Sequence, residues 1–227
     1  MSVDRILCLA NSYKHGHRCV AGIDLATKRW VRLIGRHVPG CLTVSETCYA
    51  DGKQAAILDV FEAELGENCG TNCHPEDVYV TGEPWRLTHR ISEQRDLECL
   101  SEHISKRPSV LQGYTDNVSA ERVIEVARER SLELIEPTDL WWWIRENKDK
   151  RKNRAVFRVS RESRVRYDLS VTDPPWLDQL NLLPAGIYHH ALFFGDKPPR
   201  TLLTMSLSEP FENFHYKLVA GVVNLPA

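Results

Sequence analysis

The stretch "LCLANSYKHGHRCVAGIDLATKRWVRLIG", residues 7–35, contains three short apolar runs separated by polar connections. Short runs rich in β-favouring residues are typical of strands. We therefore predict a meander of three strands over residues 6–10, 18–24 and 30–34. The first connection, residues 11–18, carries more cations and hydrogen-bond donors than a turn between two strands requires, which indicates a binding loop.

The rest of the chain continues this strand-rich pattern, with two helical segments predicted over residues 93–103 and 119–130. Further strand-like runs cover residues 55–64, 78–81, 85–91, 132–144, 154–160, 164–172, 189–194, 201–207 and 216–223. Each strand-rich half has about the strand count of a five-stranded OB (oligonucleotide/oligosaccharide-binding) Greek-key barrel. We predict an α+β chain, mainly β with helical connectors. Its parts are a first OB-like barrel (1–92), a helical connector (93–131) and a second OB-like barrel (132–227).

Composition narrows the class of protein. The chain has 227 residues, of which 42% are hydrophobic, and this is enough for two cores of ordinary size. It has no apolar run of the roughly 18 residues that a membrane helix needs and no signal-like N-terminal segment, so we expect a cytoplasmic protein. Seven cysteines form an odd set without a disulfide-like spacing, which argues against a secreted disulfide scaffold.

Charge is distributed unevenly along the sequence. Residues 61–139 hold 17 acidic residues against 8 basic ones, whereas residues 145–166 hold ten Lys and Arg against three acidic residues. A basic stripe in an otherwise acidic chain is typical of a site for a polyanion. A solvated charged hairpin is the alternative, with the acidic segment of the same chain as its partner.

Alternation places the basic side chains of the predicted hairpin on one face. Arg154 and Arg158 in its first strand, and Arg164 and Arg166 in its second, lie opposite an apolar face. These four guanidinium groups repel one another unless an anion lies beside them. The hairpin therefore predicts contacts with phosphate groups.

Three consecutive tryptophans, 141–143, precede this hairpin. Because side chains alternate along a strand, at least one indole should face away from the core. We predict that this is Trp142 and that it stacks on a nucleic-acid base.

Several stretches, in order, resemble the dual OB domain family of prokaryotic proteins. They are the opening stretch given above, "HPEDVYVTGEPW" (74–85), "SLELIEP" (131–137), "RAVFRVSRESRVRYDLSVTDPPW" (154–176) and "LLTMSLSEPFENFHYKLVAGVV" (202–223). The resemblance implies two successive OB folds that recognise nucleic acid, often beside prokaryotic defence or conflict systems. Among the matching positions are Arg32 and Lys217.

These observations together predict a non-catalytic module that binds DNA or RNA as the recognition subunit of a larger assembly. In the opening loop, cations neutralise phosphates, histidines stack on bases, and the amide and hydroxyl donate hydrogen bonds. The candidate nucleic-acid-binding residues are Asn11, Ser12, Lys14, His15, His17, Arg18, Arg32, Trp142, Arg154, Arg158, Arg164, Arg166 and Lys217.

Other functions stay open at this point. One alternative is a sensor of a nucleotide or modified base, with a pocket between the barrels; another is an interaction scaffold for partner protein subunits. We expect no cofactor, although Cys69, Cys73 and His74 could form part of a zinc site with a distant fourth ligand. The chain has no Walker loop, Gly-x-Ser-x-Gly elbow or His-Glu-x-x-His motif. Asp168 and Asp173, five positions apart, have the spacing of nuclease carboxylates that bind a metal ion, but Asp173-Pro174 fits a turn equally well.

Overall fold

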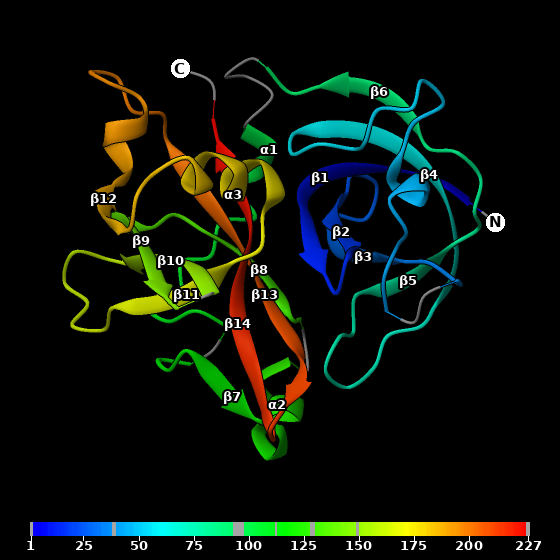
Figure 1. The fold of residues 1–227 in the computed structure, drawn as a ribbon. Coiled ribbons are helices and arrows are strands. Elements are labelled where there is room, and N and C mark those ends of the chain that lie inside the picture. The colour runs from blue at the N-terminus through cyan, green and yellow to red at the C-terminus, as the bar shows by residue number, and fades with distance from the viewer. Residues whose placement is uncertain are drawn as a thin grey trace.

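A closed ring of five strands forms the N-terminal part of the chain (Figure 1). The structure is a computed structural model, and it describes residues 2–37, 40–92, 98–111, 113–127, 130–148 and 150–225. The ring contains β1 (Ser2–Lys14), β2 (His17–Asp24), β3 (Arg29–Ile34), β5 (Asp77–Val80) and β4 (Asp59–Asn68), in that order, and the pairing of β4 with β1 closes it. β3 and β5 run parallel, and the other neighbours are antiparallel. A short 3₁₀ helix, η1 (Ser45–Thr47), lies between β3 and β4, and β6 (Arg86–Arg90) pairs with β4 outside the ring.

The length of β1 allows the ring to close. Residues 2–7 pair with β4, whereas residues 6–14 pair with β2, so one strand serves two neighbours. A bulge between Cys8 and Ala10 bends the strand at this change of partner. Gly22 faces the bend, and a Cβ atom there would lie 2.0 Å from the Leu7 carbonyl oxygen. The bend therefore requires a residue without a side chain at position 22.

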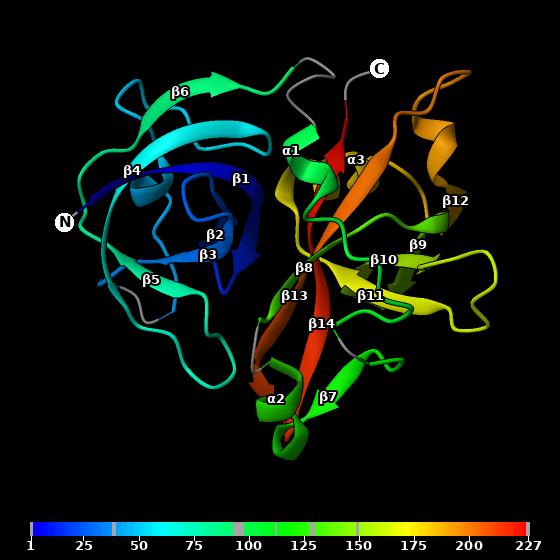
Figure 2. The same cartoon turned by 180° about the vertical axis from the view of Figure 1, so that it is seen from behind.

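The C-terminal part forms a second sheet with the order β12, β9, β10, β11, β14, β13, β8, and β7 pairs with β14 (Figure 2). Its strands are β7 (Asn117–Ser119), β8 (Leu132–Ile135), β9 (Thr138–Asn147), β10 (Lys150–Arg158), β11 (Tyr167–Val171), β12 (Gly186–His189), β13 (Thr201–Phe211) and β14 (Phe214–Asn224). Its helices and those of the connector are α1 (Glu98–Ser101), α2 (Ala120–Ala127), α3 (Pro174–Asn181) and the 3₁₀ helix η3 (His190–Phe193).

This second sheet repeats the topology of the first ring. β8 and β9 are separated only by Glu136 and Pro137, and together they act as one bent strand, because β8 pairs with β13 and β9 with β10. Read this way, the order is β8/β9, β10, β11, β14, β13, with β11 and β14 parallel, as β3 and β5 are. The prediction of two OB-like barrels in a mainly β chain is confirmed.

Alternation in the basic hairpin is as the sequence predicts. Ala155 and Phe157 of β10, and Tyr167 and Leu169 of β11, are buried in the core of the second barrel. The opposite face of β10 carries Arg154 and Arg158. Arg164 and Arg166, which were predicted in the second strand, precede β11, because this strand begins only at Tyr167. The hairpin strands are paired in antiparallel register from Arg154 to Phe157.

The two barrels share a buried interface along β1 and β14. Thr204 donates a hydrogen bond of 2.7 Å to the Leu9 carbonyl. A Cβ atom on Gly221 would lie 2.2 Å from the same oxygen, so the strands meet backbone to backbone. Leu7 and Leu9 of the first barrel join Leu202 and Val223 of the second in one apolar cluster. These contacts between β1, β13 and β14 thus fix the position of one barrel relative to the other.

Two predicted elements differ from the structure, and a third is only partly described. The opening connection is not a long loop: residues 11–14 continue β1, and His17 begins β2. Residues 189–194, predicted as a strand, form the end of β12 and the helix η3. Of the helix predicted over 93–103, α1 is described and residues 93–97 lie outside the described part.

The domain boundaries stay predictions, although β7 lies in the predicted connector and pairs with the second barrel. Within the described residues, none of the helices is long and apolar enough for a membrane span.

Candidate nucleic-acid interface

A cavity of about 430 Å³ lies between the two barrels. From the first barrel it is lined by side chains of β1, β2 and β3, among them Ser12, Cys19 and Arg32. From the second barrel it is lined by β10 and β11, which contribute Arg154 and Ser170, and by the β13–β14 hairpin. In OB folds, the face of the second and third strands, with the loops between strands one and two and strands four and five, binds oligonucleotides. At the cavity, the first ring contributes β2, β3 and the turn between strands one and two, and the second ring contributes β10, β11 and the hairpin of strands four and five.

The β1–β2 hairpin forms one edge of the cavity mouth. His15 and Gly16 have φ angles of 51° and 81°, as a tight two-residue turn requires. β1 and β2 stay paired up to this turn, and the Tyr13 amide donates a hydrogen bond of 2.8 Å to the Thr172 carbonyl of the second barrel. Residues 11–14 and 17–18 of the predicted loop are therefore strand residues, and His15 and Gly16 form the turn.

Lys14 spans the mouth of the cavity. Its Nζ atom donates to the Gly40 carbonyl at 2.9 Å and to Oε1 of Glu209 at 3.0 Å. Tyr13 and Phe211 also line the cavity, and they are 47% and 62% exposed. The mouth thus combines a partly buried ammonium group with two accessible aromatic rings.

Arg32 is a deeply buried cation of the cavity wall. Its Nε atom donates to Oδ1 of Asp77 at 2.7 Å, and the residue is 2% exposed. Burial raises the pKa of Asp77, although the guanidinium opposes this shift. The Nη2 atom of Arg32 is buried and has no hydrogen-bond partner. A buried guanidinium nitrogen without a partner is costly, and an acceptor on a ligand would satisfy it.

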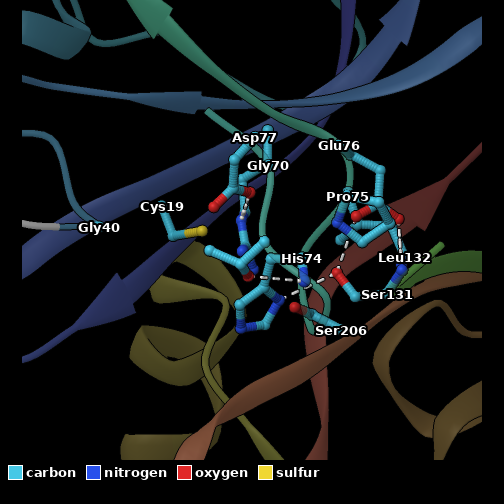
Figure 3. Close-up of polar contacts among 12 residues, drawn as sticks. Cys19, Gly40, Gly70, His74, Pro75, Glu76, Asp77, Ser131, Leu132 and Ser206 are labelled. Carbon is cyan, nitrogen blue, oxygen red and sulfur yellow. Dashed lines mark hydrogen bonds and ion pairs between the residues drawn. The ribbon is translucent and has the colours of Figure 1, made fainter. Parts of the chain in front are cut away.

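A polar cluster behind this wall links the two barrels (Figure 3). Glu76, which precedes β5, accepts hydrogen bonds from the Ser131 amide, from the Ser131 hydroxyl at 2.9 Å and from the Leu132 amide at 3.1 Å. The His74 Nδ1 atom lies 3.1 Å from the same hydroxyl oxygen. Because Ser131 donates to Glu76, we assign the proton to Nδ1 of His74, which leaves Nε2 as an acceptor.

His74 is 3% exposed, and its Nε2 atom has no hydrogen-bond partner. Burial, with the nearby charges of Arg32 and Lys14, lowers the pKa of His74 to about 2, so the imidazole stays neutral. The sequence indicated His74 only as a partial zinc ligand. In the part of the chain that the structure describes, no three His, Cys, Asp or Glu side chains are placed to hold a metal ion. Glu76 was missed, since nothing local distinguishes it from a surface glutamate.

Lys217 lies in the wall of the cavity, but its ammonium group turns into the second barrel. The Nζ atom donates to the Gly113 carbonyl at 2.8 Å and lies 5.5 Å from the centroid of the Tyr167 ring. Burial lowers the pKa of Lys217 to about 8. The side chain is 1% exposed and thus has no path to a ligand in this conformation.

Other residues of the opening segment lie away from this cavity. Asn11 donates to the Ala55 carbonyl at 2.7 Å, and the Arg18 guanidinium lies 4.4 Å above the Tyr13 ring. Asn11 and Arg18 line a smaller cavity of about 230 Å³ that also contains Asp173. His17 is half-buried opposite Lys14. The segment is therefore divided between two sides of the hairpin.

The arginine face is largely neutralised from within. Arg154 donates to Oδ1 of Asp168 at 2.7 Å and to the Ser170 hydroxyl at 2.6 Å. Arg166 donates to Oδ2 of Asp139 at 2.7 Å. The sequence left open that the acidic segment 61–139 neutralises these arginines. Only Asp139, its last residue, pairs with one of them here, and Asp168 belongs to the hairpin itself. Arg158 is half-buried and Arg164 is exposed.

The prediction for Trp142 is wrong. Its side chain is fully buried, packs against Trp176 with ring centroids 4.9 Å apart, and donates to Nδ1 of His190 at 3.0 Å. Trp141 and Trp143, on the other face of β9, are the partly exposed indoles. The alternation was predicted with the wrong phase. Leu140 and Ile144 share the buried face with Trp142, whereas Asp139 and Arg145 share the face of Trp141 and Trp143, and this local signal was missed.

Comparison with known proteins assigns the chain to a family. The family described as dual OB-containing domain matches residues 4–222, and the chain belongs to it. This confirms the resemblance noted in the sequence and identifies a module of the type that commonly binds nucleic acid. No match was found among curated proteins or among solved structures.

Proposed function

We propose that this protein is a non-catalytic module that binds single-stranded nucleic acid in the cavity between its two barrels. The observation that carries this proposal is the meeting of the two OB ligand faces around one basic, aromatic-rimmed cavity. Lys14, Arg32 and Arg154 supply positive charge, and Tyr13 and Phe211 supply accessible rings for base stacking.

The size of the cavity favours one unpaired nucleotide over a duplex. About 430 Å³ falls at the lower end of the range of small-molecule sites, which is about 300–1,000 Å³. The wall contains a buried donor without a hydrogen-bond partner, the Nη2 atom of Arg32. Behind the wall lies a buried acceptor without one, the Nε2 atom of His74. A base edge offers both kinds of complementary group.

We further propose that the protein acts in the cytoplasm as the recognition subunit of a prokaryotic defence or conflict system. The support is the family resemblance. Purification of the tagged protein from its native host would test this proposal. A constant set of partner subunits with nucleases or effectors among them would support it, and recovery of the protein alone would contradict it.

A sensor of a free nucleotide is the second candidate, since the same cavity could enclose one small ligand. The two functions differ in what stabilises the protein. A sensor would show a higher melting temperature with mononucleotides and no response to oligonucleotides, whereas the proposed module would respond to oligonucleotides.

Fluorescence anisotropy tests the proposed function directly. Labelled single- and double-stranded DNA and RNA would be titrated with the protein at low and near-physiological salt. We expect salt-sensitive binding of single strands that weakens in Lys14→Ala and Arg154→Ala. Lys53→Ala, which removes an 80% exposed cation outside the cavity, is the matched control. Equal loss in all three variants, or no binding of any strand, would contradict the proposal. The double variant Arg158→Ala/Arg164→Ala tests the arginine face separately.

A further inference from the structure

One row of side chains runs from the cavity across the outer face of the second barrel. Cross-strand partners Ile187, Trp143, Arg154, Ser170 and Leu218 follow one another through β12, β9, β10, β11 and β14. Directly paired residues share a face, and each strand step is about 4.8 Å, so the row spans about 19 Å. The last three of these residues also line the cavity.

The far end of this row opens into a second hollow of about 480 Å³. Trp141 and Trp143 line it together with Val156 and Ile187, and Ile187 is 59% exposed. Trp141 pairs with Val156 across the sheet, just as Trp143 pairs with Arg154. The floor of the hollow is therefore apolar and aromatic.

Two guanidinium groups contact this floor: Arg166 lines the hollow, and Arg145 stacks on one face of the Trp143 indole. The Cζ atom of Arg145 lies 3.4 Å from the centroid of the Trp143 ring, and its Nη2 atom donates to Oδ2 of Asp168 at 2.6 Å. The Trp141 indole donates to Asp139 at 2.6 Å, which fixes the orientation of its ring. Arg166, which also lines the hollow, donates to the same carboxylate. Arg154 of the cavity wall also donates to Asp168, so three arginines contact the two aspartates and leave a positive balance beside the indoles.

An aromatic floor with a cationic border is the arrangement that binds single strands, because bases stack while phosphates meet the cations. Asp168 connects the hollow with the cavity, since it lines the hollow and accepts a hydrogen bond from Arg154 of the cavity wall. The hollow and the cavity thus lie on either side of the Arg154–Asp168 pair along the sheet face.

We propose that the hollow of Trp141 and Trp143 is a second base-stacking subsite, so that one single strand runs from the cavity along the row to these indoles. This inference rests on the proposed function, because the cavity holds the first nucleotide. It specifies an extended ligand of several nucleotides, and it orients that ligand across β10 and β9.

Length-dependent binding tests the subsite. Thymidine and uridine oligonucleotides of about 4 and about 12 nucleotides, which lie within the site sizes of OB folds, would be titrated by anisotropy. We expect the longer strand to bind more tightly to the unmodified protein. In Trp141→Ala/Trp143→Ala its affinity should fall about a hundredfold, about tenfold for each indole, while the short strand changes less than about twofold. Leu182→Ala, which removes an 86% exposed apolar side chain elsewhere, should change neither.

The outcomes separate the subsite from the proposed function. If the longer strand is unaffected in the double variant but weakens in Lys14→Ala, the subsite is wrong and the cavity is retained. If neither strand binds the unmodified protein, both proposals are wrong. Photo-crosslinking of an iodouridine oligonucleotide to the unmodified protein gives a result that does not depend on variant folding. Crosslinks at Trp141 or Trp143 would support the subsite, and crosslinks at cavity residues alone would contradict it.

Discussion

The Nζ atom of Lys14 lies 3.0 Å from Oε1 of Glu209, although the two residues are 195 positions apart in the sequence. This ion pair joins the β1–β2 hairpin of the first barrel to the β13–β14 hairpin of the second at the cavity mouth. The side chains are 18% and 47% exposed, so solvent weakens the pair. A phosphate that reaches Lys14 has to displace a carboxylate that is already there.

Glu209→Gln should therefore tighten binding of single-stranded oligonucleotides by about three- to tenfold. The change releases Lys14 and removes a negative charge from the mouth. Anisotropy titrations at low and near-physiological salt would measure the gain, which should be larger at low salt. Glu212→Gln removes the same charge from the exposed turn between β13 and β14, outside the cavity lining, and serves as the control. A loss of affinity, or a gain equal to that of the control, would show that Glu209 does not compete with the ligand.

Lys14→Ala should reduce the salt dependence of binding. Each phosphate neutralised by a cation contributes about 0.7 to the slope of log affinity against log salt for a single strand. We expect the slope to become shallower by about that amount, with the slope of Lys53→Ala unchanged. Titrations at four or more salt concentrations would provide both slopes. An unchanged slope in Lys14→Ala would indicate that another group meets the phosphate.

Glu76→Ala should destabilise the protein by about 3 kcal/mol or more, because it leaves three donors of Ser131 and Leu132 without an acceptor at a buried site. Urea denaturation would measure the loss. Glu67→Ala, whose side chain is 70% exposed and pairs weakly with Arg36, should cost less than about 0.5 kcal/mol. Similar losses for the two variants would mean that the Glu76 cluster does not hold the barrels together.

Gly221→Ala should also destabilise the protein, since the new methyl group would lie 2.2 Å from the Leu9 carbonyl oxygen. Neither strand can yield without separating the barrels. We expect a loss of about 2 kcal/mol or more in urea denaturation, together with weaker oligonucleotide binding. Gly66→Ala is the control, because a Cβ atom there meets its nearest neighbour at 3.5 Å. Tolerance of both alanines would show that the close backbone contact is not required.

The free energy of unfolding should decrease as pH rises from about 4 to 6, because Asp173 ionises in the folded state over this range. Burial raises the pKa of Asp173 from its ordinary value near 4 to about 6, and the carboxylate accepts a 2.7 Å hydrogen bond from the Val222 amide. The folded state thus holds this proton more tightly than the unfolded chain does, so ionisation above pH 6 costs on the order of 3 kcal/mol. In Asp173→Asn this part of the decrease should disappear. Asp178→Asn, at an exposed neighbour, should follow the unmodified protein. Parallel stability curves for Asp173→Asn and the unmodified protein would contradict the shift.

Local pattern was sufficient to predict most strands and the faces of the basic hairpin. Ala155 and Phe157 alternate with Arg154 and Arg158, and a period of two leaves one face for the core. The count of strands in each half also predicted two barrels of the OB kind. These features depend on residues that are close together in the sequence, so they could be predicted without the structure.

The site depended on contacts that no local pattern reveals. Residues 11–14 were predicted as a loop because they are polar, yet they continue β1, and the Tyr13 amide donates a hydrogen bond to the Thr172 carbonyl of the second barrel. The phase of the three tryptophans, in contrast, could have been predicted locally, because apolar Leu140 and Ile144 share the face of Trp142. Arg32 and Lys217 were named from the family resemblance, and both are buried. Their partners distinguish them: Lys217 Nζ donates to the Gly113 carbonyl, whereas Nη2 of Arg32 has no hydrogen-bond partner.

The shared packing of β1 and β14 has a consequence for how fast and how tightly a ligand is bound. Because Thr204, Leu9 and the apolar cluster around them fix the two barrels together, the cavity walls are already in place before any ligand arrives. The conformational entropy of bringing the walls together is lost during folding and not during association. Association should therefore follow a single exponential in stopped-flow experiments, with a rate that rises linearly with ligand concentration, as expected of a preorganised receptor.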